Sequence, residues 1–251
     1  MRAYQRLSAR VYDHDKPKPL EEAFSFYRDQ VDQARSPVLE AMCGSGRFLV
    51  PLIELGYQVD GVDASGYMLA SCRKRLAAIG QKSRLYETYL DQFNPEREYG
   101  LVFIPAGSFS LVVSQPAIEE SLLRIHRALK DGGKLIVEVS QVRSAESYSW
   151  PWGGKWWDFP NGQRIILSWM GHYDAEKRIA SSINRYELVN GVELHETEFE
   201  EFNLRHYDVS EFTFLLAEAG FTDIAATKLF SSEASEEEDE TIMFTCLKPL
   251  V

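Results

Sequence analysis

Two glycines and two acidic residues are spaced in a way that suits the binding of a nucleotide-like ligand. Glu40 lies in the short apolar run VLEA, and Gly44 and Gly46 follow within MCGSGR. Glycines let the backbone come within contact distance of a ligand, and the free N–H groups of a following helix favour an anion. Asp63 ends a second apolar run, QVDGVD, where a carboxylate can accept both hydroxyls of a ribose. These residues predict a site for an adenosine compound that carries an anionic group.

The elements that would position these residues alternate between short apolar runs and helix-like segments. The runs, which are typical of parallel strands buried on both faces, are residues 38–41, 58–63, 84–87, 100–105 and 134–139. Between most of them lie amphipathic helical patterns, one from Ser65 to Gly80 and another that is expected to stop at Gly132-Gly133. This alternation predicts a doubly wound α/β sheet. Its ligand crevice lies beyond the carboxyl ends of the strands, where the glycines and Asp63 would meet.

The pattern changes after Val139. All five tryptophans fall between Trp150 and Trp169, and three strand-like runs follow at about 163–173, 178–188 and 193–204. Asn190-Gly191 between the last two predicts a hairpin with a type I′ turn. We therefore expect an antiparallel β lobe inserted into the sheet, in which the tryptophans form either core or the wall of a pocket.

The chain closes with one more helix and a strand pair. The helix is expected over about 210–219, and the strand-like runs are 221–227 and 241–247. The segment between these runs has no helical pattern and is rich in acidic residues, so the two strands should form a hairpin and one should run antiparallel to the rest. Together with the five earlier runs, they predict a seven-stranded sheet whose last strand is antiparallel.

Composition limits the classes of function. The chain has 251 residues and a formal net charge of −11, which would repel phosphate backbones and argues against nucleic acid as a partner. No run approaches the roughly 18 apolar residues of a membrane span, and no secretory signal is visible, so we expect a cytoplasmic protein without a membrane partner. The three cysteines have no zinc-like spacing, and no metal site is expected. The oligomeric state, monomer or homodimer, stays open.

Two ligands compete for the predicted crevice. A dinucleotide site needs the spacing G-x-G-x-x-G, but counting from Gly44 the third position is Leu49. An acidic residue at position 40 would also be unfavourable beside a pyrophosphate, whereas it could approach an ammonium group. S-adenosylmethionine carries an amino group, a carboxylate, a ribose and an adenine, and it matches the whole set of residues.

The sequence resembles the class I S-adenosylmethionine-dependent methyltransferases of small molecules. The resemblance covers roughly residues 36–140, and the closing helix and strand pair (210–248) agree with it in order. Four motifs carry it: LEAMCGSGR, VDGVDASGYML, GLVFIPAGSF and LLRIHRALKDGGKLIVEV. It implies a Rossmann-like core, formed by residues 1–145 and 206–251, with S-adenosylmethionine as the cofactor. Residues 146–205 would be the antiparallel insertion that covers the active site and selects the acceptor.

The resemblance also assigns cofactor-binding residues. Those around the methionine part would be Glu40, Met42, Gly44, Gly46 and Arg47, with Asp63 on the ribose, and Ala64, Met68, Tyr89 and Leu90 along the adenine. Pro105 to Phe109, including Gly107, would line the floor beneath the sulfonium, and Tyr12 would fold over the cofactor from the N-terminal segment. The chain departs from the family in two places. Met42 stands where many members have glycine, and Asp91 comes two residues later than the usual adenine-binding aspartate.

His206 and Tyr207 are the candidates for a general base, because they lie at the end of the insertion and could face the methyl donor. The sulfonium is already activated, however, so alignment of nucleophile, carbon and sulfur supplies much of the acceleration. An amine acceptor needs only to be deprotonated.

The predicted function is methyl transfer from S-adenosylmethionine to a nitrogen or oxygen of a small molecule, by in-line displacement. The chain has Ile104-Pro105-Ala106-Gly107 in place of the [ND]PP[YF] tetrapeptide of nucleic-acid amino-methylating enzymes. Two alternatives stay open. One is a non-catalytic protein that binds S-adenosylmethionine, and the other is an NAD-dependent oxidoreductase, which the broken glycine spacing disfavours.

Overall fold

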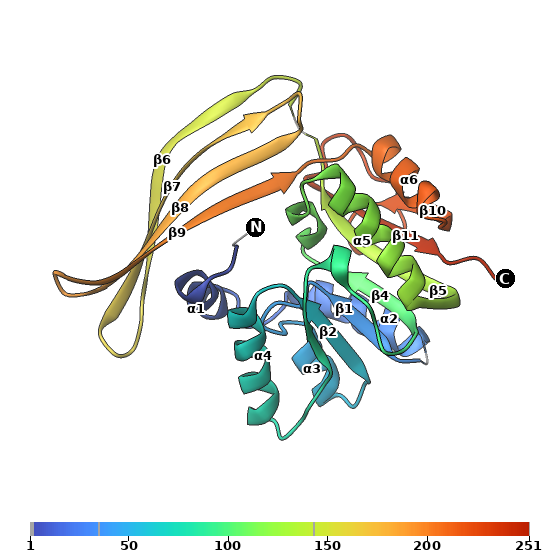
Figure 1. Cartoon of the computed structure of the whole chain (residues 1–251), viewed down its shortest axis with the longest axis horizontal. Helices are drawn as coiled ribbons and strands as arrows, with labels where there is room; N and C mark the ends of the chain where they lie inside the picture. The colour runs from blue at the N-terminus through green and yellow to red at the C-terminus, as the bar shows by residue number, and fades with distance from the viewer. Residues whose placement is uncertain (1–2, 35, 143, 251) are drawn as a thin grey trace.

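A seven-stranded sheet forms the centre of the protein. The computed structural model describes residues 3–34, 36–142 and 144–250, and the sheet has the strand order β10-β11-β5-β4-β1-β2-β3 (Figure 1). Its strands are β1 (Val38–Ala41), β2 (Val59–Asp63), β3 (Leu85–Glu87), β4 (Tyr99–Ile104), β5 (Leu129–Ser140), β10 (Thr222–Thr227) and β11 (Thr241–Leu247). β11 runs antiparallel to both of its neighbours, and β1 to β5 are parallel. The predicted fold class is confirmed.

The order of the strands places the ligand crevice. β1 lies between β4 and β2, so the chain leaves β1 toward one side and later returns to its other side. At such a reversal the connections after neighbouring strands turn to opposite faces and leave a space above the carboxyl ends. The turns that follow β1, β2 and β4 therefore border one crevice.

Helices cover both faces of the sheet, as the alternating pattern requires. The helices on one face are α2 (Glu21–Ala34), α3 (Leu49–Glu54) and α4 (Gly66–Ala78), and their apolar side chains share a core with one side of the strands. On the other face, α5 (Gln115–Ala128) and α6 (Val209–Glu218) form the larger core with the short helices η1 (Leu90–Gln92) and η2 (Ser108–Leu111). Ser65 caps α4, since its hydroxyl accepts the N–H of Met68.

The insertion is a separate antiparallel sheet of four strands rather than the three that the sequence pattern indicated. The strands are β6 (Tyr148–Asp158), β7 (Gln163–Asp174), β8 (Ile179–Asn190) and β9 (Glu193–Arg205), paired in that order. Two glycines make room for tryptophan rings, because a Cβ at Gly153 would lie 2.6 Å from the ring of Trp169 and one at Gly171 would lie 2.3 Å from Trp150. Part of the tryptophan cluster therefore packs flat on its own sheet.

The N-terminal helix α1 (Arg6–Asp15) packs on the inserted sheet (Figure 1). Leu7 and Val11 share a small core with side chains of β7 and β8. The carboxylate of Glu198 on β9 accepts the backbone N–H groups of Leu7 (2.9 Å) and Ser8 (3.2 Å) at the start of the helix. A negative charge at a helix N-terminus satisfies free N–H groups and favours the helix dipole, so β9 fixes where α1 begins.

Two local predictions were wrong in detail. α5 ends at Ala128 and Leu129 already belongs to β5, so Gly132-Gly133 does not stop the helix. The hairpin between β8 and β9 pairs Asn190 with Glu193, which makes Gly191 and Val192 its central residues. Of these two central residues only Gly191 has a positive φ, +59°, so the turn is not the expected type I′.

Among the helices that the structure describes, none combines the length and the apolar character needed to cross a membrane.

Candidate active site

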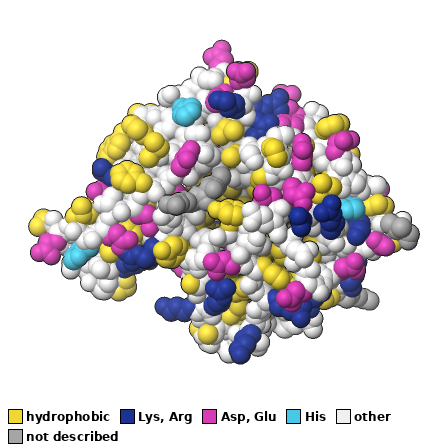
Figure 2. Space-filling view, viewed as in Figure 1, with side chains coloured by type: hydrophobic (Ala, Val, Ile, Leu, Met, Phe, Trp, Pro, Cys, Tyr) yellow, Lys and Arg dark blue, Asp and Glu magenta, His cyan; other side chains and the backbone are white. Residues whose placement is uncertain are grey.

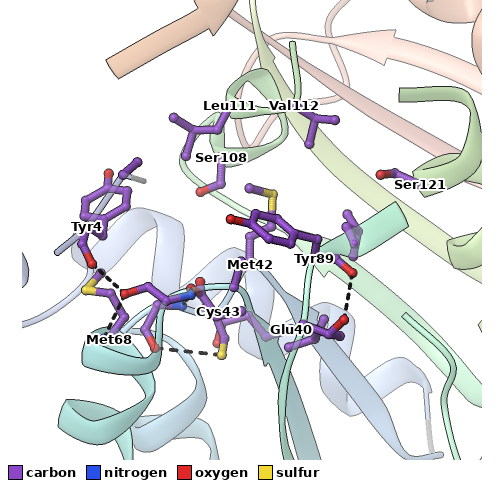
Figure 3. Close-up of a pocket in the computed structure, with 18 of the residues that line it drawn as sticks. Tyr4, Glu40, Met42, Cys43, Met68, Tyr89, Ser108, Leu111, Val112 and Ser121 are labelled. Carbon is purple, nitrogen blue, oxygen red and sulfur yellow. Dashed lines mark hydrogen bonds between the residues drawn. The ribbon is translucent and has the colours of Figure 1, made fainter. Parts of the chain in front are cut away.

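A cavity of about 480 Å³ lies at the carboxyl ends of β1, β2 and β4. Thirteen of the predicted residues line it: Tyr12, Glu40, Met42, Gly44, Arg47, Asp63, Ala64, Met68, Tyr89, Leu90, Pro105, Ala106 and Ser108. In Figure 3, Tyr4 lies at one end of the cavity and Ser121 at the other, with Met42 and Tyr89 between them. The cavity is therefore elongated and is bordered by segments that lie far apart in the sequence.

The turn after β1 is held in left-handed backbone conformations. Met42, Gly44 and Gly46 have φ values of +57°, +56° and +76°. Gly44 lines the cavity, and a Cβ there would come within 3.0 Å of the Met68 side chain. Gly46 does not line the cavity; a Cβ there would lie 2.6 Å from Sγ of Cys72 on α4. Gly44 thus lets the backbone face the cavity, whereas Gly46 lets the turn pack against α4.

Asp63 joins the turn after β1 to the turn after β2. One carboxylate oxygen accepts the N–H of Gly44 at 2.8 Å, and the other accepts the N–H of Ser65 at 2.8 Å. Burial raises the pKa of Asp63, and these two backbone hydrogen bonds oppose the rise. Each oxygen can accept a second hydrogen bond, so the carboxylate is oriented by the backbone and still able to accept from a ligand.

Glu40 and Arg47 place a carboxyl group and a guanidinium group at the glycine turn. Glu40 is 2% exposed, and burial raises its pKa to about 8 against the opposing effects of the Leu49 backbone and Arg47. Oε2 of Glu40 and Nε of Arg47 have no hydrogen-bond partner among the described residues. Buried polar atoms without a partner are rare and call for a ligand or ordered water. A ligand with one cationic and one anionic group would satisfy both side chains.

The N-terminal segment closes one side of the cavity. Ala3, Tyr4 and Tyr12 line it, and the rings of Tyr4 and Tyr12 are in edge contact at 5.6 Å. The Tyr4 carbonyl accepts the hydroxyl of Ser65 at 2.5 Å, and the backbone N–H of Tyr4 donates to Glu200 of β9 at 3.2 Å. Tyr4 was not predicted from the sequence, because nothing near position 4 marks a ligand-binding motif; only its contact with the turn after β2 reveals it.

The far end of the cavity lies between η1 and α5. Asp91 and Gln92 line it next to the predicted Tyr89 and Leu90. Other lining residues that were not predicted are Cys43, Phe48, Val62, Ser65, Thr88, Leu111 to Ser114, Ala117 and Ser121. Many of them directly follow or precede a predicted residue, so their neighbours in the sequence were the available signal. Ser121 comes from the middle of α5 and had no such signal.

Four further predicted residues do not line the cavity: Gly107, Phe109, His206 and Tyr207. Phe109 is fully buried and packs its ring on Phe212 at 5.5 Å, and Gly107 lies between the lining residues Ala106 and Ser108 without bordering the cavity itself. Tyr207 is also fully buried, and its ring packs on Phe212 at 4.8 Å.

The ring of His206 lies against Tyr173 at 5.3 Å, next to the end of β9. The structure thus brings neither His206 nor Tyr207, the predicted candidates for a general base, to the cavity, because the main core and the inserted sheet take up their side chains. None of the five tryptophans lines the cavity either.

The chain is similar to known proteins in sequence and in fold. Residues 38–133 match a family model described as "Methyltransferase domain". A protein of Geobacillus sp. (strain WCH70), provisionally named a methyltransferase, is 23% identical over 223 residues, which are 86% of each chain. The sugar N-methyltransferase KedS8 from Streptoalloteichus sp. ATCC 53650 superposes with a TM-score of 0.74 at 16% identity, over 96% of this chain and 92% of its own. CalS10 from Micromonospora echinaspora, an amino pentose methyltransferase solved with S-adenosylmethionine bound, has a TM-score of 0.68 at 16% identity, over 99% of both chains.

Residues 38–133 thus match a methyltransferase domain, and the structural likeness extends over nearly the whole chain. These findings indicate an S-adenosylmethionine-dependent methyltransferase, as the resemblance predicted.

Proposed function

We propose that this protein transfers a methyl group from S-adenosylmethionine to an amine nitrogen of a small molecule, by in-line displacement. The observation that carries the proposal is the joint placement of Glu40, Arg47, Gly44 and Asp63 around one cavity. When bound, the cofactor supplies an electrophilic methyl group on a sulfonium. The residues of the chain hold it, orient it and keep water away from it.

The cavity residues fit this cofactor group by group. Glu40 and Arg47, each with a buried atom that lacks a partner, suit the ammonium and the carboxylate of the amino-acid part. Asp63, already oriented by two backbone N–H groups, suits the ribose hydroxyls. Met68 and Leu90 supply apolar contacts suited to a flat purine, and Asp91 lies next to Leu90 with a carboxylate for an amino group.

The chemistry of the lining favours an amine over a hydroxyl acceptor. Among the described residues that line the cavity there is no histidine and no lysine, and the lining carboxylates of Glu40, Asp63 and Asp91 are the ones assigned above to the cofactor. Burial raises the pKa of Tyr4 and also that of Tyr12, so both phenols stay protonated and are poor bases. A hydroxyl nucleophile needs a base to remove its proton, whereas a neutral amine already has a lone pair to attack with.

A small acceptor agrees with the surface of the protein and with its structural relatives. The net charge is −11, and acidic and basic side chains are interspersed over the face shown in Figure 2 without a continuous basic surface. Both structural relatives described above are named for sugar acceptors, a sugar N-methyltransferase and an amino pentose methyltransferase. We therefore propose an amino sugar or a similarly polar amine as the acceptor class, selected by the inserted sheet and the N-terminal segment.

The test is turnover with a defined panel. Purified protein is mixed with S-adenosylmethionine and, separately, with amino sugars, other small amines and matched hydroxyl compounds, and release of S-adenosylhomocysteine is measured. The proposal predicts turnover with at least one amine and none with its hydroxyl counterpart. Turnover confined to hydroxyl compounds would refute the choice of nitrogen. Tight binding of S-adenosylhomocysteine by calorimetry without any turnover would favour the non-catalytic alternative.

A further inference from the structure

Glu138 is a buried carboxylate that the cofactor site, as described above, does not use. It lies near the carboxyl end of β5 and is 3% exposed. One oxygen accepts the hydroxyl of Tyr27 at 2.5 Å, and the other accepts the backbone N–H of Ala106 at 2.8 Å. A charged group placed in the centre of a sheet is unfavourable unless it is hydrogen-bonded, and here both oxygens are occupied by donors from different segments.

The backbone that Glu138 holds has an unusual conformation. Ala106 has a φ of +60° and Gly107 a φ of +65°. A left-handed conformation is strained for alanine, whose Cβ comes too close to its own backbone, and persists only where the surroundings impose it. The N–H of Gly107 also donates toward the Glu138 carboxylate. Successive N–H groups of a turn that converge on one anion form a stable nest, so the carboxylate favours this turn over an ordinary one.

The turn that Glu138 holds borders the cavity directly. Pro105, Ala106 and Ser108 all line it, directly after β4. The hydroxyl of Ser108 donates back to the Pro105 carbonyl at 2.8 Å, which closes the turn on itself. A shift of the Ala106 backbone would therefore move both neighbouring lining residues together.

Tyr27 connects this arrangement to the opposite layer. Its ring is fully buried on α2, against Phe103 (4.9 Å) and Phe48 (5.3 Å), so its position is fixed by packing. Its hydroxyl reaches Glu138. Phe48 itself lines the cavity beside Arg47. The chain of contacts runs from α2 through Glu138 to the Ala106 turn.

We propose that Glu138, with Tyr27 as its donor, is a positioning residue for methyl transfer: it holds the Ala106–Gly107 turn in the shape that aligns the acceptor with the methyl group. This inference rests on the proposed function. Misplacement of reacting groups by about 1 Å can lower a rate by roughly 100-fold, whereas binding of the cofactor depends mainly on the turns after β1 and β2. Disturbing Glu138 should thus reduce kcat more than cofactor affinity.

The chain offers a matched control at the other end of the sheet. Asp60 on β2 is also 3% exposed and accepts the hydroxyl of the fully buried Tyr99 at 2.9 Å. Arg97 completes that group with hydrogen bonds of 2.8 and 2.9 Å. Neither Asp60 nor Tyr99 lines the cavity. The two tyrosine–carboxylate pairs share chemistry and burial and differ in what they support.

The experiment compares Glu138→Gln and Tyr27→Phe with Asp60→Asn and Tyr99→Phe. For each variant, kcat and KM are measured with the best amine of the panel, the affinity for S-adenosylhomocysteine by calorimetry, and Tm by thermal unfolding. We expect kcat to fall by about tenfold or more in Glu138→Gln and to a smaller extent in Tyr27→Phe, with the affinity changed by less than about threefold. The control variants should keep the kcat of the wild type, even where their Tm is lower.

The outcomes separate the two proposals. If the wild type turns over and the Glu138 and Tyr27 variants match the controls in kcat, the positioning role is wrong while the proposed function stands. A parallel loss of affinity and kcat would also overturn it, because it would indicate general damage to the site. If Glu138→Gln does not fold, the kcat of Tyr27→Phe relative to Tyr99→Phe tests the positioning role. If the wild type releases no S-adenosylhomocysteine with any acceptor, the proposed function fails and the inference falls with it.

Discussion

Replacing Asp63 by alanine should weaken cofactor binding by about two orders of magnitude. The carboxylate lines the cavity, and its two oxygens are oriented by N–H groups of Gly44 and Ser65 at 2.8 Å. We propose that the remaining acceptor positions bind the two ribose hydroxyls. A hydrogen bond to a charged group contributes about 1.5 kcal/mol or more, so two of them amount to about 3 kcal/mol. At about 1.4 kcal/mol per factor of ten, this is roughly a 100-fold loss of affinity.

The difficulty is that alanine would also release the two backbone turns that Asp63 joins. A ligand analogue separates the two effects: S-adenosylhomocysteine is compared with a derivative that lacks both ribose hydroxyls, by calorimetry on the wild type and on Asp63→Ala. If the carboxylate binds the hydroxyls, the derivative should bind the wild type about 100-fold more weakly. It should then be almost insensitive to the substitution, because the bonds in question are already absent.

An equal loss for both ligands in Asp63→Ala would refute the assignment and show that Asp63 acts only on the turns. Glu87→Gln serves as a charge control. Glu87 ends β3, next to β2 in the sheet, where it pairs with Asp63 in the register of the strands, yet it does not line the cavity. Its removal lowers the local negative charge by the same amount and should leave the affinity within about twofold, since exposed charges interact weakly.

Three further outcomes are expected. The pKa of Glu40 is raised by burial from 4.5 to about 8, so the stability that its protonated form contributes is fully present at pH 4 and is lost as pH rises through about 8. Glu40→Gln should therefore raise Tm of the ligand-free protein at pH 9 relative to wild type and have little effect at pH 4. A larger effect at pH 4 than at pH 9 would contradict the shift. Gly46→Ala should lower Tm more than Gly80→Ala, because both have φ values near +70° but only Gly46 has an atom, Cys72 Sγ, within 3 Å of the added carbon. In thermal scans the excess should be about 2 °C or more, and equal losses would mean that the turn gives way. Glu198→Gln should weaken S-adenosylhomocysteine binding by several-fold through α1, and protease digestion should cleave the N-terminal segment faster; unchanged values of both would show that packing alone holds the helix.

Much of the fold was predictable because its central strands are buried on both faces. Such strands read as continuous apolar runs, and the run VLEA has the same bounds as β1 (Val38–Ala41). β6 was missed because Pro151, Gly153 and Gly154 interrupt its sequence and are normally read as strand breakers. It forms because it is an edge strand, where a proline need not donate to a neighbour.

The candidate site was predictable from spacing where the residues lie in the turns after the strands, whereas Tyr12 on α1 and Met68 on α4 were predicted through the family resemblance. Those turns meet by the topology of the sheet, so the amino-acid sequence alone was enough to place Glu40, Gly44 and Asp63 together. Tyr4 and Ser121 reach the cavity through packing of α1 and α5, which leaves no local signal. The placement of Tyr207 left no local signal either, since a residue beside the insertion could face the cavity or the core. In the structure its ring packs on Phe212 in the core.

The carboxylates around the cavity suggest that the site is built at some expense of stability. Burial raises the pKa of Glu40, Asp63 and Glu138 alike, so each ionised form is less stable in the folded chain than it would be in water. A protein selected for stability alone would replace such groups. We expect Glu40→Gln, Asp63→Asn and Glu138→Gln to leave Tm of the ligand-free protein at pH 8–9 unchanged or higher while turnover falls. Asp60→Asn should behave in the opposite way, because it breaks a carboxylate's bonds to Arg97 away from the cavity. If Tm fell in all four variants, these carboxylates would stabilise the core like any other hydrogen-bonded group. The idea that the site lowers the stability of the protein would then be wrong.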